Sequence, residues 1–191
     1  MNFVIDRLVG YAEANMTVTK FELAKLRFML EVILFNTAEI LAIFIFFAII
    51  GKIPEFFVTA IVLTSIRLPT GGFHFRKYIY CFILSFVIFA LIILVLPNIT
   101  HIFGLMEVML LTTLITTFAL APVSKRNSAH PEKDNFKMKI IATVIVLFYS
   151  VLLLFLRDNP FASIVVWTLF FQAMQLIPGK LMLVYRGSNS I

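Results

Sequence analysis

The sequence is poor in charged residues, and this scarcity decides its broad class. Only 14% of the 191 residues are charged, whereas 61% are hydrophobic, and the mean hydropathy is +1.02. Soluble domains are about half apolar and about one quarter charged. The composition therefore excludes an ordinary soluble domain and predicts an integral membrane protein, surrounded by membrane lipids and with no nucleic-acid partner.

Cysteine and several common enzyme motifs are nearly or wholly absent. Cys81 is the single cysteine, so neither an internal disulfide framework nor a multi-cysteine metal site can form. The sequence also lacks an H-E-x-x-H motif, a Walker P-loop and a clear internal repeat of the kind common in transporters. We therefore expect no metal and no cofactor. A small transporter and a non-enzymatic membrane scaffold are the alternatives to an enzyme.

Six apolar segments follow one another along the chain. Because a hydrocarbon core about 30 Å thick needs about 20 apolar residues per helix, they predict an all-α polytopic membrane helix bundle of about six transmembrane helices. The second segment is short, so it must tilt, extend into residues 67–70 or be re-entrant. The predicted spans are residues 28–50, 54–66, 79–96, 101–120, 138–156 and 161–177.

The whole chain, residues 1–191, is predicted to form a single membrane domain. In residues 1–27, apolar positions recur at helical spacing beside charged ones, which indicates an amphipathic interfacial helix rather than a signal peptide. Residues 28–178 are expected to form the membrane bundle, and residues 179–191 a cytoplasmic tail.

Lysine and arginine are distributed unevenly when the spans are taken in alternation. With the N-terminus in the cytoplasm, only Lys52 and Arg157 lie outside, and all the other basic residues lie inside. Cytoplasmic loops of membrane proteins carry such an excess. The pattern predicts a multi-pass protein of the cell membrane with cytoplasmic N- and C-termini.

A histidine and the single cysteine lie near each other at the cytoplasmic mouth of the third predicted span. His74 follows the pair Gly71-Gly72 and precedes Cys81 by seven residues. In one regular helix this spacing separates the side chains by about 10.5 Å along the axis, too far for proton transfer. The glycines permit a turn that brings the groups together, and a helix N-terminus would stabilise a thiolate. A nucleophilic pair is one interpretation; a packing cysteine and an interfacial histidine are the other.

The run from Arg67 through Gly71-Gly72-Phe73-His74 to Cys81 resembles the AgrB peptidases of Gram-positive quorum-sensing systems. Ala121-Pro122, before a basic loop with Pro131 inside it, is a second correspondence. The resemblance implies a membrane-embedded cysteine endopeptidase that processes an AgrD-like propeptide at the cytoplasmic face, and it is compatible with a homodimer.

The resemblance also implies a role for each member of the pair. Cys81 would attack the propeptide carbonyl at the junction with its C-terminal tail, and His74 would take the thiol proton and pass it to the leaving amine. The resulting acyl-enzyme thioester would then be closed into the thiolactone or lactone ring of an autoinducing peptide.

Further residues are candidates for substrate contacts. Arg67 could hold a carboxylate or stabilise an oxyanion, or simply extend to lipid headgroups. Gly71, Gly72 and Ser85 border the same region, although a bond from the serine hydroxyl to its own helix is the simpler expectation. The basic residues that could attract the propeptide tail, or equally anionic lipid, are Lys125, Arg126, Lys133 and Lys137.

A third catalytic group is harder to assign. No acidic residue lies between Glu55 and Glu107, so Thr70, Ser85 or a backbone carbonyl are the candidates for orienting the imidazole. In the last span, Gln172 and Gln175 are expected to form hydrogen bonds between helices.

Overall fold

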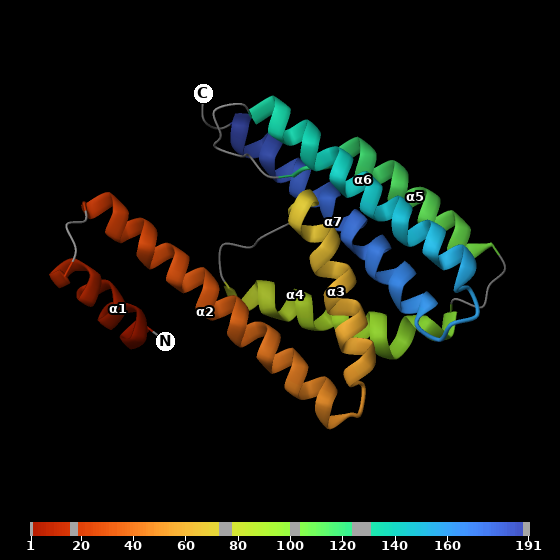
Figure 1. The fold of residues 1–191 in the computed structure, drawn as a ribbon, viewed down its shortest axis with the longest axis horizontal. Helices are drawn as coiled ribbons and strands as arrows, with labels where there is room; N and C mark the ends of the chain where they lie inside the picture. The colour runs from red at the N-terminus through yellow and green to blue at the C-terminus, as the bar shows by residue number, and fades with distance from the viewer. Residues whose placement is uncertain (1, 16–18, 73–77, 100–103, 124–130, 189–191) are drawn as a thin grey trace. The chain divides into compact units, whose positions relative to one another are not determined.

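The computed structural model of the chain describes residues 2–15, 19–72, 78–99, 104–123 and 131–188. Every regular element in these ranges is a helix (Figure 1). Residues 1–51 and 52–191 form two compact units.

The first unit pairs two helices. Helix α1 (Asn2–Asn15) packs on α2 (Lys20–Ile49), and an ion pair of 2.7 Å joins Arg27 to Asp6. Thr19 begins α2 with a capping box, in which its hydroxyl accepts from the Glu22 N–H and the Glu22 carboxylate accepts from the Thr19 N–H. The predicted N-terminal helix is thus present, while its place at the membrane surface stays a prediction.

The second unit is built around α7 (Ala162–Ser188). This helix packs on α3 (Ile53–Thr70) and on α5 (Leu105–Leu120), and α6 (Pro131–Phe155) packs on α3 and α5. In Figure 1, α5, α6 and α7 lie side by side. Three of these helices meet in a core cluster formed by Val62, Ile66, Val146 and Leu169.

Helix α4 (Tyr78–Ala90) continues without a break into a π-helical turn, η1 (Leu91–Val95), and a 3₁₀ turn, η2 (Leu96–Ile99). The C-terminal half of this segment holds it to the unit. Ile88, Phe89, Ile92 and Ile93 are buried, and the Phe89 ring centroid lies 5.6 Å from that of Phe56 on α3. The beginning of α4 is more exposed, because Tyr78, Ile79 and Tyr80 all face outward.

The predicted polytopic helix bundle is confirmed. Within the described residues, five helices are long and apolar enough to cross a membrane, and α5 is a shorter apolar helix. With 16 residues it is about 24 Å long, somewhat less than a full hydrocarbon core. The five helical segments are Lys20–Ile49, Ile53–Thr70, Tyr78–Ile99, Glu132–Phe155 and Ala162–Met182.

Three helix ends differ from the sequence-based boundaries. The second span extends through Thr70, so the expected extension into residues 67–70 is present. Pro131 is the first residue of α6 rather than part of a loop, since proline is well suited to a first helical turn. The last helix passes through Pro178 and enters the predicted tail as far as Ser188, because membrane helices tolerate the single lost backbone bond.

The second unit has two distinct ends. At one end the Thr70 carbonyl accepts a hydrogen bond of 2.9 Å from the Val123 N–H. At the other, Arg157 pairs with Glu107 at 3.0 Å, and Asn98 and Asn159 line one hollow. Asn98, Arg157 and Asn159, which the predicted alternating topology assigns to the outside, therefore lie together at one end of this unit.

Candidate functional site

The helical path breaks at Gly71. Its φ of 73° and ψ of −162° lie in a region of backbone conformation that is essentially restricted to glycine. The Gly71 N–H still donates to the Arg67 carbonyl at 2.9 Å and closes the last turn of α3. The next helix, α4, begins at Tyr78. Between them, residues 73–77, which include the predicted base His74, lie outside the described part of the chain.

The Arg67 side chain lies against Gly72. A Cβ atom at position 72 would be 3.0 Å from Arg67 Nε and 3.4 Å from its Cζ and Nη2. The arginine is half-buried, and its guanidinium forms no hydrogen bond or ion pair with the residues that the structure describes. A guanidinium in this situation offers several N–H donors to an anionic group, such as a carboxylate or an oxyanion.

A buried polar contact joins the end of α3 to α7. The Gln172 amide nitrogen donates to the Thr70 hydroxyl at 3.1 Å and to the Gly71 carbonyl at 2.9 Å. The Thr70 hydroxyl itself donates to the Ile66 carbonyl at 2.7 Å. Both Thr70 and Gln172 are completely buried. The prediction of an interhelical hydrogen bond is confirmed for Gln172; Gln175 forms none with the described residues.

The segment after α5 closes the same end of α3. The Ala121–Pro122 peptide is cis, and the next residue, Val123, supplies the N–H that bonds to the Thr70 carbonyl. Val123 packs with Ala121, Ala142 and Leu176 in a small apolar cluster. Sequence reasoning singled out Ala121-Pro122 but missed Val123, because a backbone donor has no signature in the identity of the side chain.

Cys81 and Ser85 lie on the next helix. Cys81 is in the first turn of α4 and Ser85 is one turn later, so both side chains lie on a similar face, and both are half-buried. The positive end of the helix dipole favours a thiolate at such a position. The structure thus groups Arg67, Gly71 and Gly72 with Thr70 and Gln172, and it carries the cysteine on the helix that follows.

Two of the four predicted tail-binding lysines and arginines are described. Lys133 and Lys137 are exposed one turn apart near the beginning of α6. Lys125 and Arg126 lie outside the described residues. In the same described ranges, no three histidine, cysteine, aspartate or glutamate side chains gather closely enough to hold a metal ion.

Comparisons with known proteins agree over nearly the whole chain. The family model of Accessory gene regulator B matches residues 5–176. A putative AgrB-like protein of Clostridium beijerinckii is 28% identical over 170 residues, covering 87% of this chain and 83% of the relative. The Accessory gene regulator protein B of Staphylococcus aureus strain Newman is 20% identical over 174 residues, covering 91% of this chain and 92% of the relative. No solved structure matches the chain.

Proposed function

Because this chain belongs to the accessory gene regulator B family, we propose that it is a membrane-embedded cysteine endopeptidase of quorum-sensing peptide maturation. Its substrate would be an AgrD-like propeptide, from which it removes the C-terminal tail. The break in the helical path at Gly71, between Arg67 and Cys81, is the observation that carries the proposal. It allows His74 to leave the helix axis, as a His-Cys pair seven residues apart requires.

The proposed reaction is an acyl transfer in two stages. The Cys81 sulfur attacks the carbonyl carbon at the junction with the tail, and His74 accepts the thiol proton. The carbon–nitrogen bond breaks, the tail amine takes this proton and leaves, and a thioester on Cys81 remains. A cysteine or serine of the peptide then attacks the thioester carbonyl, so that a thiolactone or lactone forms and the Cys81 thiol is restored.

Arg67 is proposed to bind an anionic group of the substrate or of the transition state. What supports this role is the position of its guanidinium against Gly72, together with the lack of any hydrogen bond or ion pair to the described residues. Gly72 lets the guanidinium approach the backbone closely, and Ser85 follows Cys81 by one turn of the same helix. Both residues border the proposed site without taking part in the bond changes.

The beginning of α6 is proposed to attract the propeptide tail. Lys133 and Lys137 present two exposed positive charges on adjacent turns, and Lys125 and Arg126 precede them in the sequence. Such a group raises the local concentration of an acidic segment, an effect that weakens as the salt concentration rises.

The test is co-expression with the small propeptide encoded beside the enzyme, followed by mass spectrometry of the peptide products. Cys81→Ala and His74→Ala are expected to abolish tail removal, and Cys81→Ser to impair it severely, because an alkoxide forms far less readily than a thiolate. Ser150→Ala is a suitable control, since the Ser150 hydroxyl bonds within its own helix to the Val146 carbonyl at 2.8 Å.

The thioester gives a second, direct measurement. Rapid acid quenching should trap the propeptide fragment on Cys81, and hydroxylamine should release it. Retained processing by the folded alanine variants would overturn the proposal.

A further inference from the structure

One side chain of α7, that of Gln172, binds both Thr70, the last residue of α3, and Gly71, where the helical path breaks. Gln172 is more than 100 residues away in sequence from Thr70 and Gly71, yet its amide nitrogen bonds to the Thr70 hydroxyl and to the Gly71 carbonyl. Gln172 and Thr70 are completely buried. The contact therefore lies within the second unit, with the Gly71 end only partly buried.

The orientation of the Gln172 amide is fixed by its partners. A carbonyl oxygen can only accept a hydrogen bond, so the amide atom 2.9 Å from the Gly71 oxygen must be the nitrogen. The Thr70 hydroxyl has two carbonyl acceptors within reach, Ile66 at 2.7 Å and Gly71 at 3.1 Å. Toward the Gln172 amide nitrogen, which carries only donors, the hydroxyl oxygen must accept. Both amide hydrogens are used in this way. The amide oxygen points elsewhere and has no donor among the described residues.

These contacts decide how the chain leaves α3. The last carbonyls of a helix have no partner within the helix, and in a membrane water does not readily supply one. Here the Thr70 carbonyl is bonded by the Val123 N–H, and the Gly71 carbonyl by Gln172. Two bonds from separate parts of the chain thus fix the planes of two successive peptide groups. The direction of the backbone after Gly71 follows from those planes.

We propose that Gln172 is a positioning residue of the peptidase site. Its amide hydrogens fix the Gly71 peptide group and thereby the path of the chain from α3 toward His74 and Cys81, and they do not touch the substrate. The inference rests on the proposed function, because it names what is positioned; the contact itself is a feature of the fold.

The first test compares two glutamines of the same helix. Gln172→Met removes both donors at similar volume and is expected to lower kcat for tail removal about 10- to 100-fold, with KM within about twofold, because small misplacements of reacting groups cost this much. Gln175→Met makes the same chemical change at a half-buried position with no hydrogen bond to the described residues, and it should leave kcat within about twofold. Equal kcat values for the two variants would overturn the proposal.

Gln172→Glu reduces the number of donor hydrogens. Because position 172 is completely buried, the new carboxyl is expected to be neutral, with one O–H in place of the two amide hydrogens. It cannot donate to the Thr70 hydroxyl and the Gly71 carbonyl together, so kcat should fall, although less than in Gln172→Met. Full retention of kcat in Gln172→Glu would show that two donors are not needed and would contradict the proposed contact.

Two buried threonines provide a matched pair for the partner of Gln172. Thr70 and Thr168 are both completely buried, and each donates at 2.7 Å to the carbonyl four residues earlier. Thr70 differs from Thr168 in two ways: it accepts from Gln172, and its hydroxyl lies 3.1 Å from the Gly71 carbonyl, so it contacts the same peptide group as Gln172. Thr70→Val should therefore lower kcat, whereas Thr168→Val should not. In the double variant Thr70→Val/Gln172→Met, the loss should be no larger than in Gln172→Met alone, and multiplied losses would contradict a shared contact.

Hydrogen exchange makes the inference testable apart from catalysis. Gln172→Met should accelerate exchange of the Gly71 and Val123 N–H groups, which close the end of α3, while Gln175→Met should not. Failure of the wild-type protein to cleave the propeptide would refute the proposed function and leave this measurement valid. Unchanged exchange in the folded Gln172→Met protein would refute the positioning role even if the wild-type protein is an active peptidase.

Discussion

Gly71 and Gly72 are adjacent in sequence, but different constraints act on them. Gly71 has a φ of 73° and a ψ of −162°, a conformation that strains any residue with a Cβ atom. Gly72 does not have a positive φ of this kind; its restriction is the Arg67 side chain, whose Nε would lie 3.0 Å from an added Cβ. The first glycine is required by the backbone, and the second by a neighbouring side chain that can move.

Gly71→Ala is accordingly expected to lower the free energy of unfolding by about 1–3 kcal/mol, the usual cost of a strained backbone conformation. Gly72→Ala should change it by less than about 0.5 kcal/mol, in the range of ordinary surface substitutions, because the flexible Arg67 side chain can shift by a few tenths of an ångström. The same shift should reduce tail removal by Gly72→Ala. Unfolding in mixed micelles and the peptide assay measure the two effects, and equal stability losses would contradict this distinction.

Helix α7 contacts the candidate site at two positions. It carries Gln172 against the end of α3, and two turns later Gly179 faces Val123. A Cβ atom at position 179 would lie only 2.6 Å from Val123 Cγ1. A close helix approach of this kind is typical of small residues in membrane bundles. Since Val123 also donates to the Thr70 carbonyl, the spacing between α7 and the segment 121–123 affects how α3 ends.

Gly179→Ala should therefore push the segment 121–123 away from α7 and lower the free energy of unfolding by about 1–3 kcal/mol, as overpacking does. Adding Val123→Ala removes the clashing methyl group and should restore part of the loss, with a coupling of about 0.5–3 kcal/mol in the double-mutant cycle. Unfolding of the four proteins in one detergent measures this coupling. Additive losses would show that the two residues do not press on each other.

At the scale of the whole molecule, the sidedness predicted from the basic residues agrees with the direction of the helices within the second unit. Asn98 and Asn159 line one hollow, next to the Arg157 side chain that pairs with Glu107. The beginning of α6, with Lys133, follows α5 at its other end. Lys52 pairs with Glu55 at 2.7 Å, so both basic residues assigned to the outside have an acidic partner.

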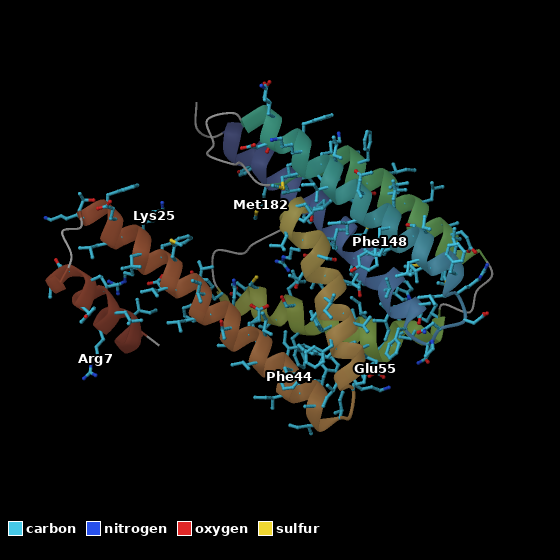
Figure 2. All side chains as sticks on the ribbon, in the orientation of Figure 1. Arg7, Lys25, Phe44, Glu55, Phe148 and Met182 are labelled. Carbon is cyan, nitrogen blue, oxygen red and sulfur yellow. The ribbon has the colours of Figure 1, made fainter. Side chains whose placement is uncertain are left out.

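Figure 2 shows that side chains extend outward along the whole length of the helices, with Phe148 on α6 labelled among them. Phe148 is exposed, as expected of a surface that faces lipid.

Single cysteines placed in a Cys81→Ser background test the predicted topology. A membrane-impermeant maleimide should label Asn98→Cys and Asn159→Cys in intact cells, and Lys133→Cys only after the membrane is opened, because an N-terminus in the cytoplasm places the first two outside. The Asn98 and Lys133 positions also decide whether the short helix α5 crosses the membrane. Labelling of both from the same side would contradict a six-span arrangement with a cytoplasmic peptidase site.

Much of this fold could be predicted from the sequence because it depends on local properties. The apolar segments, the N-terminal helix and the helical character of each span follow from composition and periodicity over a few turns. The predicted helix ends were less accurate. Proline is compatible with both a boundary and a continuing helix, so the sequence did not show that α6 begins at Pro131 or that α7 continues through Pro178 to Ser188. The candidate pair His74 and Cys81 also came from the sequence, and its geometry stays a prediction.

By itself, the sequence determined that this is a polytopic helical membrane protein with one cysteine, and that Gly71 and Gly72 separate the second span from His74, which precedes the cysteine. Only the tertiary structure decided which polar groups meet. Gln172 and Gln175 look alike in the sequence, yet only Gln172 reaches the Gly71 carbonyl. The Val123 backbone N–H bonds to the Thr70 carbonyl, and the Arg67 side chain lies against Gly72; neither contact is visible in the sequence. The physical reason is that these contacts join residues from different helices, and their partners are fixed by how the helices pack rather than by any local pattern.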